Sequence, residues 1–440
     1  MKVLFCSLGC DKNLVDTEVM LGILAEGNYE FADDENEAEA AVVNTCCFIN
    51  DAKEESIQTI LDLAEFRKSG QLKALIVTGC LAQRYFDEMK IEIPEVDAVL
   101  GIASIEHIKE ALDNVLSGEQ KDYKDELTTP PLGGMRRELT TGGYYAYLKI
   151  AEGCSKHCTY CIIPYVRGEY RSVPMDKLIQ EANDLASKGV KELILVAQET
   201  TLYGKDFDGQ KHLPELLREL CKIEGLQWIR VLYCYPEEIT PELIRTMKEE
   251  PKICKYLDIP IQSGSDEILR RMGRWTDSAS IKALIDELRR EIPDICLRTS
   301  LISGFPGETK SQHEETVKFV KEIGFDRLGV FTYSAEEGTL AAEMPDQIKQ
   351  SIKEKRRDEI MKLQQEIAFA KSEAMIGTKM TAFIEGMIPE DGVAVARTYM
   401  DAPGVDGQLF IETDRTFMSG DMVHVLITDA NGYDLIGVLD

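Results

Sequence analysis

Residues 153–161 read Gly-Cys-Ser-Lys-His-Cys-Thr-Tyr-Cys and directly follow a strand-like run at 146–151. Three thiolates in one short loop, Cys154, Cys158 and Cys161, favour a soft metal and are able to wrap an iron–sulfur cluster. Three ligands on a four-iron cluster leave one iron open for a cofactor, whereas a tetrahedral zinc site requires a fourth ligand. A zinc knuckle completed by a distant residue is the structural alternative.

This loop opens a long alternation of strands and helices. Strand-like runs occur at 146–151, just before the loop, and at 193–197, 228–232, 256–259, 295–302 and 327–331 after it, with helical stretches between them. Six such units in one domain predict a full or partial TIM-like barrel, whose site lies at the carboxyl ends of its strands. The cysteine loop occupies that position after the first strand.

The N-terminal segment shows the same alternation on a smaller scale. Strand-like runs at 3–5, 41–43, 75–77 and 97–100 are separated by amphipathic helices, which predicts a parallel sheet. Cys10, Cys46 and Cys80 each follow one of these runs, at the edge where open sheets place ligands. Three buried free cysteines that behave as small hydrophobic residues are the alternative interpretation.

Changes of composition divide the chain into four segments. We predict an N-terminal α/β domain over 1–118, a linker rich in Pro and Gly over 119–143, the barrel domain over 144–373, and a small β-barrel over 374–440. The expected fold class is therefore α/β, with a parallel-sheet domain, a partial barrel and a terminal β-barrel.

Composition excludes several classes of protein. The net charge is −28, and no run approaches the roughly 20 apolar residues that span a bilayer. The N-terminus becomes polar too early for a secretory signal, so we expect a soluble cytoplasmic protein without membrane contact. Twelve cysteines, several of them clustered, then indicate metal binding rather than disulfides.

The cysteine spacing resembles the signature of the radical S-adenosylmethionine (SAM) superfamily. Glycine-containing loops at 196–201, 259–266 and 302–309 occur in the order that the superfamily shows. Segments 7–16, 44–46 and 78–80 resemble the N-terminal domain of the methylthiotransferase family, and the tail resembles a TRAM domain. The resemblance thus covers nearly the whole chain.

This resemblance implies two [4Fe-4S] clusters and SAM as cofactors. One cluster would be held by Cys154, Cys158 and Cys161, and an auxiliary cluster by Cys10, Cys46 and Cys80. The SAM contacts implied by analogy are Tyr160 against the adenine, Glu199, Gln262 and Arg298. Two positions depart from the family pattern: Asp11 stands where proline is commoner, and Cys47 stands where glycine is usual. Cys47 therefore competes with Cys46 as ligand, and alignment on residues 44–45 favours Cys46.

The resemblance also implies a transferase that replaces a C–H bond with C–S–CH3. SAM would serve both as methyl donor and as source of the 5′-deoxyadenosyl radical, with an external electron donor and a sulfur source as partners. Segments 7–16, 333–339 and 401–407 look most like the branch that β-methylthiolates an aspartate of ribosomal protein S12, free or on the small subunit. A tRNA adenosine C2 methylthiotransferase is the runner-up, and a non-enzymatic iron–sulfur or zinc scaffold is the third interpretation.

The charge of the tail bears on the substrate. Residues 376–440 contain three basic and eleven acidic residues, a net charge of −8. Such a surface repels phosphate and attracts a basic protein. We therefore expect a protein substrate, no direct nucleic-acid binding, and a monomer.

Overall fold

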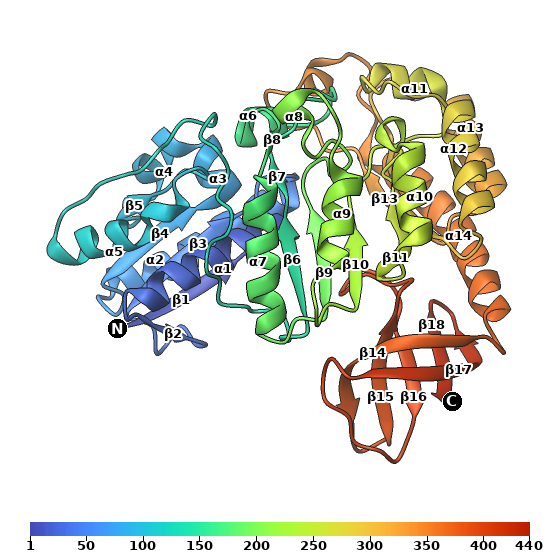
Figure 1. The fold of residues 1–440 in the computed structure, drawn as a ribbon. Helices are drawn as coiled ribbons and strands as arrows, with labels where there is room; N and C mark the ends of the chain where they lie inside the picture. Colours follow the sequence, from blue (N-terminus) through green and yellow to red (C-terminus); the bar gives the residue numbers. More distant parts are fainter.

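The computed structural model describes all residues, 1–440, and contains three main sheets in sequence order (Figure 1). The N-terminal sheet is fully parallel, with the order β2-β1-β3-β4-β5. Its strands are β1 Lys2–Ser7, β2 Glu30–Ala32, β3 Ala40–Thr45, β4 Ala74–Thr78 and β5 Ala98–Val99. Its helices are α1 Asp11–Glu26, α2 Asn50–Lys68, α3 Gly79–Arg84, α4 Phe86–Glu92 and α5 Ile108–Ser117, with a 3₁₀ turn at Ile105–His107. Every residue of β3 and β4 is buried, as expected when helices cover both faces of a parallel sheet.

The central sheet has six parallel strands in the order β13-β12-β11-β10-β9-β6. They are β6 Tyr145–Lys149, β9 Glu192–Val196, β10 Trp228–Val231, β11 Ile253–Asp258, β12 Cys296–Ser303 and β13 Arg327–Thr332, and a two-stranded ribbon of β7 Ala151–Glu152 and β8 Arg171–Ser172 follows β6. Neighbours in space are neighbours in sequence, so the sheet is an open, TIM-like partial barrel.

The helices of this domain are α6 Ile163–Arg167, α7 Met175–Ser187, α8 Lys205–Asp208, α9 Leu213–Cys221, α10 Pro241–Glu249, α11 Asp266–Arg271, α12 Ser278–Glu291, α13 Lys310–Ile323 and α14 Gln350–Ala374, with 3₁₀ turns at Pro236–Glu238 and Leu340–Glu343. The longer helices pack along the sheet, whereas α6, α8 and α11 lie at its upper end in Figure 1. Packing of helices on strands forms the largest core, of 43 buried residues. Burial of this apolar surface is the main force that holds the domain together.

The C-terminal strands form a closed barrel in the order β14-β15-β16-β18-β17. Their bounds are β14 Lys379–Ile388, β15 Val393–Thr398, β16 Leu409–Glu412, β17 Met422–Asn431 and β18 Asp434–Leu439. Phe383 and Ala402 of this segment join a buried cluster with Trp228 and Tyr256 of the central sheet. The small barrel therefore packs against the base of the partial barrel, below it in Figure 1.

Buried charges reinforce that contact. Arg397 of β15 pairs with Glu192 of β9 at 2.5 Å, and Arg230 of β10 pairs with the same carboxylate at 2.8 Å. All three side chains are at most 2% exposed. Two guanidinium groups around one carboxylate satisfy a charge that would otherwise be costly to bury.

The predicted three-part α/β architecture is confirmed. Three short strands were not expected from the sequence: β2, a three-residue edge strand, β8 of the two-stranded ribbon, and β18, which closes the small barrel. None of the helices combines the length and apolar composition that crossing a membrane requires.

Candidate active site

The three N-terminal cysteines come from neighbouring strands. Cys10 follows β1 at the N-cap position of α1, Cys46 follows β3, and Cys80 lies in the first turn of α3 after β4. Because β1, β3 and β4 are adjacent and parallel, their carboxyl ends lie along one edge. Strand order reverses between β1 and β3, and such a switch point is where open sheets bind ligands.

Gly9 brings the first two loops into contact. Its φ is +91°, and a Cβ placed there would lie 2.7 Å from Cys46 Cβ and 2.8 Å from Cys46 Sγ. Asn13 ties the same loops together, because its side-chain amide donates to Leu8 O at 2.8 Å and to Thr45 O at 3.0 Å. The structure thus brings Cys46 directly against the loop that carries Cys10.

The third thiol is buried near the other cysteines of this sheet edge. Burial raises the pKa of the Cys80 thiol to about 12, the Arg167 guanidinium opposes that rise, and negative charge on Cys47, Cys10 and Cys46 adds to it. Buried thiols of this kind stay protonated on their own and deprotonate when a cation binds them. Cys10, Cys46 and Cys80 at one sheet edge fit the three-thiolate donor set of an iron–sulfur cluster.

Cys47, the neighbour of Cys46 in the chain, shares buried surroundings with Cys80. It is 1% exposed and belongs to the same apolar cluster as Cys80. Burial raises the pKa of its thiol to about 11, with Arg84 as the nearby cation that opposes the rise. The close contact with Gly9 belongs to Cys46 and not to Cys47, which favours Cys46 as the ligand.

Local backbone geometry shapes the second cysteine loop. Gly153 has φ +76°, and a Cβ there would lie 2.2 Å from Glu169 O, so only glycine fits. The Cys154 amide then donates to Gly168 O at 3.0 Å, which closes the loop against the end of α6. His157 points outward, with its side chain 58% exposed and near the Glu169 carboxylate.

The thiols of this loop form a second group, in which Cys154 and Cys158 are buried and Cys161 is half-buried. Burial raises the pKa of Cys154 to about 12, and negative charge on Cys158 contributes. Burial also raises the pKa of Cys161, with further contributions from Cys158 and Cys154. Three thiols in one loop, each raised in pKa or buried beside its neighbours, again fit the donor set of a cluster.

Glu199 supplies an unpaired buried acceptor beside these thiols. Its Oε1 accepts the Thr201 amide at 3.0 Å, whereas its Oε2 is buried without any hydrogen-bond partner. Burial raises the pKa of Glu199 to about 8, and its charge in turn raises the pKa of Cys154. An orphaned carboxylate oxygen facing the cysteine loop fits the ammonium group of SAM.

The other predicted SAM contacts occupy the same end of the central sheet, with one exception. Tyr160 packs against the small apolar cluster that contains Phe305 and Tyr333. Gln262 has φ +72°, and its backbone bridges β12 through Ser300 O and the Ile302 amide. Arg298 lies deeper, paired with Asp258 at 2.9 Å and 3.6 Å from Asp406 of the C-terminal barrel. Its predicted contact with SAM stays a prediction.

The loop after β10 connects the two groups of thiols. The Tyr235 hydroxyl lies 3.6 Å from Cys158 Sγ. Two residues earlier, Tyr233 contacts the residues that follow Cys10: its hydroxyl lies 3.2 Å from Asp11 Oδ1, and Lys12 Nζ lies 3.4 Å from the centre of its ring. The two cysteine groups therefore border the same interface between the N-terminal and central sheets.

Sequence reasoning missed the charged residues of that interface. Arg167, Glu152, Lys149 and Asp16 are linked by ion pairs between the two sheets. The only sequence signal was that Glu152 immediately precedes the glycine of the cysteine loop. Single charged residues far apart in the chain form no repeating sequence pattern, so their ion pairs can be recognised only in the folded structure.

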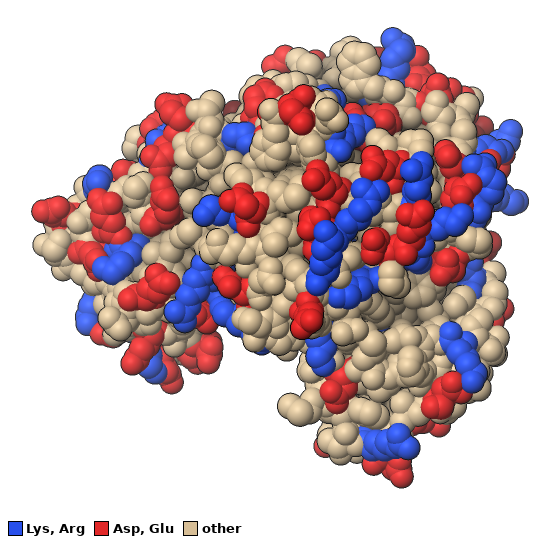
Figure 2. Space-filling model, in the orientation of Figure 1, with Lys and Arg blue, Asp and Glu red and all other residues tan.

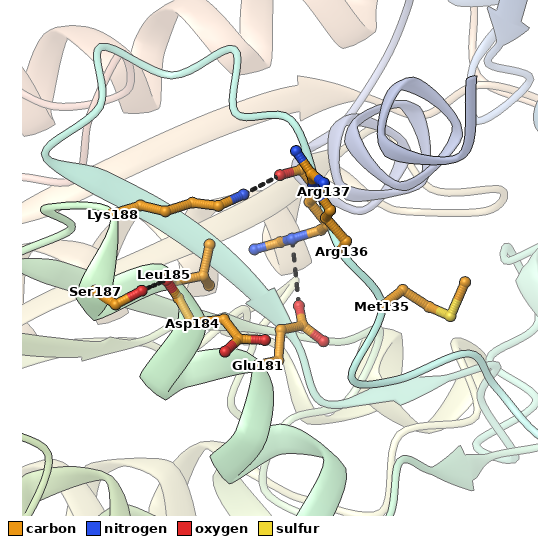
Figure 3. Close-up of a pocket in the computed structure, with 8 residues that line it drawn as sticks. All are labelled: Met135, Arg136, Arg137, Glu181, Asp184, Leu185, Ser187 and Lys188. Carbon is orange, nitrogen blue, oxygen red and sulfur yellow. Dashed lines mark hydrogen bonds and ion pairs between the residues drawn. The ribbon is translucent and has the colours of Figure 1, made fainter. Parts of the chain in front are cut away.

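A separate cavity of about 220 Å³ lies between the linker and α7, and Figure 3 shows its lining. The Lys188 ammonium donates to the Arg137 carbonyl there at 2.6 Å, and Arg137 Nε lies 3.3 Å from Glu181 Oε1 (Figure 3). None of the predicted ligand or SAM residues lines it.

Family models match three parts of the chain. The radical SAM superfamily matches residues 148–320, Uncharacterized protein family UPF0004 matches 2–101, and the TRAM domain matches 376–439. A ribosomal protein uS12 methylthiotransferase RimO of Lachnoclostridium phytofermentans is 58% identical over the full length of both chains. The chain belongs to the RimO family. RimO of Acetivibrio thermocellus is 50% identical, covering 99% of this chain and 98% of its own.

Solved structures support the fold of this RimO family member. The radical SAM methyltransferase TsrM of Kitasatospora setae matches with a TM-score of 0.54 at 14% identity, covering 75% of this chain and 72% of TsrM. The cobalamin-dependent radical SAM enzyme OxsB matches with a TM-score of 0.54 at 13% identity, covering 83% of this chain and 56% of OxsB.

Membership of the RimO family confirms the predicted enzyme class, a radical SAM methylthiotransferase with a TRAM domain. Iron–sulfur and SAM chemistry follow from the same matches. The zinc-knuckle and scaffold interpretations are therefore set aside.

Proposed function

We propose that the chain methylthiolates the β-carbon of an aspartate in ribosomal protein uS12, with two [4Fe-4S] clusters held by its two cysteine groups. The observation that supports this proposal is that two groups of three cysteines, four of the six buried, border one interface beside an unpaired carboxylate. The four sequence segments, 1–118, 119–143, 144–373 and 374–440, are the proposed domain boundaries.

Cys154, Cys158 and Cys161 would hold one cluster, and Cys10, Cys46 and Cys80 the auxiliary cluster. With SAM bound, these groups supply the one-electron and sulfur chemistry that side-chain acids and bases lack. Glu199 would bind the SAM ammonium group, Tyr160 would lie against the adenine, and Gln262 would bind SAM from the edge of β12. Arg298 is paired with Asp258 and lies near Asp406, so it would bind the SAM carboxylate in place of one of these two carboxylates.

The protein itself contributes shielding and orientation. Four of the six proposed ligand cysteines, Cys46, Cys80, Cys154 and Cys158, are at most 7% exposed. Burial at the junction of two sheets keeps water from the reacting groups, which protects a reactive carbon radical. The loop after β10 fixes the spacing of the two triads through its contacts with Cys158 and Asp11.

The C-terminal barrel favours a basic protein as substrate. Of its three basic residues, Arg397 is buried against Glu192 and Lys379 pairs with Asp440 at 2.7 Å, which leaves Arg415 exposed. Figure 2 shows no continuous basic tract on the face of this barrel that is in view. A surface with so few free cations binds phosphate poorly and suits a cationic partner.

Mass spectrometry of a deletion strain tests the substrate. The proposal expects uS12 to lose one methylthio group while tRNA nucleosides keep theirs. If tRNA instead loses a methylthioadenosine and uS12 keeps its methylthio group, the chain is a tRNA-modifying enzyme.

Reconstituted variants test the two triads. Alanine at Cys154, Cys158 and Cys161 should abolish SAM cleavage, whereas alanine at Cys10, Cys46 and Cys80 should spare SAM cleavage and stop methylthiolation. A Cys10→Ala enzyme that attaches methylthio groups at the normal rate would rule out the two-cluster proposal.

A further inference from the structure

Arg167, the last residue of α6, has a guanidinium group that is 1% exposed and contacts Cys80 of one cysteine group and Glu152, which precedes the loop of the other. Its Nε donates to Cys80 Sγ at 3.3 Å. A terminal nitrogen donates to Asn13 Oδ1 at 2.5 Å. The other terminal nitrogen lies 2.9 Å from each carboxylate oxygen of Glu152.

These contacts connect the two halves of the site through one side chain. Cys80 and Asn13 belong to the N-terminal sheet, and Asn13 is the residue that joins the loops after β1 and β3. Glu152 immediately precedes the cysteine loop of the central sheet. Because a guanidinium is planar and always charged, it holds all three partners in one fixed fork.

The surrounding charges hold Arg167 in place. Lys149 pairs with Glu152 at 2.9 Å and also with Asp16, and the Gln198 amide donates to Glu152 at 3.0 Å. Asp16 lies 3.5 Å from the Arg167 guanidinium. A buried network in which every carboxylate has partners is rigid, since each lost contact would leave a charge unpaired.

We propose that Arg167 is a positioning residue that fixes the Cys80 thiolate, and that its hydrogen bond to this sulfur favours the reduced state of the cluster on Cys10, Cys46 and Cys80. Hydrogen bonds to ligand sulfurs withdraw electron density from the iron and raise a cluster's reduction potential. The fixed distance from Cys80 to Glu152 also sets the spacing between the triads. This inference rests on the proposed auxiliary cluster.

The test uses the full chain with Cys154, Cys158 and Cys161 all replaced by alanine, so that one cluster remains. Arg167→Gln and Arg167→Lys are added to this background, and the reduction potential is measured by an EPR-monitored redox titration. We expect a more negative potential in Arg167→Gln, a smaller shift in Arg167→Lys, and an altered EPR spectrum in both.

Arg137→Gln is the matched control. Arg137 is also a buried arginine beside the N-terminal helix α1, 3.7 Å from Glu18, and it contacts none of the proposed ligand cysteines. Its replacement disturbs a comparable buried charge, so the potential should stay at the background value. A shift as large as that of Arg167→Gln would show a general packing effect and overturn the inference.

The remaining outcomes separate the inference from the proposed function. If the background variant binds no iron, the auxiliary cluster itself is wrong. If it binds iron and Arg167→Gln keeps both iron and potential, the role of Arg167 is wrong. If Arg167→Gln loses iron, the reduction potential is measured on Arg167→Lys instead. A potential equal to that of the background variant would then overturn the tuning role. Loss of iron from a folded Arg167→Lys chain would overturn it as well.

Discussion

Gly9 lies at the closest approach between the loops that follow β1 and β3. Gly9→Ala would force a Cβ into Cys46 and strain the backbone at φ +91°. We expect the variant to lose the proposed N-terminal cluster, about four iron atoms per chain, and to retain SAM cleavage. Iron analysis and 5′-deoxyadenosine assays measure this. Gly70→Ala is the control, because φ is +81° there but no atom lies within 4 Å of the added Cβ; equal iron loss in both would refute the steric argument.

Glu199 gives the stability of the cluster-free chain a defined pH dependence. Burial raises its folded pKa to about 8, above the unfolded value, so the folded state holds the proton more tightly. Stability therefore falls as pH rises toward 8, by about 2 kcal/mol between pH 6 and 8 for this group. Urea unfolding under reducing, anaerobic conditions should show that Glu199→Gln removes this slope. If the pH dependence of stability is the same in Glu199→Gln, a group other than Glu199 binds the proton.

The six proposed ligand cysteines were accessible to sequence reasoning because their spacing and their positions after strands are local patterns. Arg167, Glu152 and Tyr233 were not accessible. Each makes its contacts with residues far away in the chain, such as Arg167 with Cys80, 87 positions apart. A buried charged pair leaves no period in the sequence, and only the fold shows which carboxylate meets which guanidinium.

At the scale of elements, α13 begins with a capping box on the loop after β12. The Thr309 hydroxyl accepts the Gln312 amide at 3.3 Å, and the Gln312 side chain accepts the Thr309 amide at 2.8 Å. Thr309→Ala should cost about 1 kcal/mol of unfolding free energy, since it removes the partner of a helix-end amide. Chemical denaturation tests this, and Thr309→Ser, which keeps the hydroxyl, should retain most of the stability.

Strands with long apolar runs were predicted well, and short or interrupted strands were missed. β4 is a continuous buried run, which a parallel sheet covered on both faces requires. β2 has three residues at an exposed edge, so its sequence is too short to show the alternation or the apolar run that predicts a strand. β18 contains Gly437 within its apolar run, and its pairing with β16 and β17 depends on closure of the barrel.

At the scale of the whole molecule, the C-terminal barrel is held to the central sheet by buried charge. Arg397→Ala would leave Glu192 with Arg230 as its only cationic partner, and breaking a buried pair costs about 3–5 kcal/mol. We expect a lower melting temperature and faster proteolysis near the end of α14. Arg415→Ala, an exposed change in the same barrel, should leave both unchanged; equal sensitivity in the two variants would contradict the anchoring role.

The charge of the whole chain, −28, should govern encounter with a basic substrate. Raising the salt concentration screens the attraction between exposed charges, so the KM for uS12 should rise about tenfold between 0.05 and 0.5 M salt with little change in kcat. SAM cleavage without uS12 serves as the control and should be insensitive to salt. A KM independent of salt would mean that apolar contacts dominate recognition.

The contact between Cys80 and Arg167 has a consequence for biosynthesis. A ribosome exposes Cys80 well before it has translated Arg167, because 87 positions separate them. While only the first sheet has emerged, this thiol lacks its cationic neighbour. Insertion of iron into the N-terminal half is therefore expected to follow synthesis of α6 rather than accompany the nascent chain, and the delivery machinery would meet a nearly finished polypeptide.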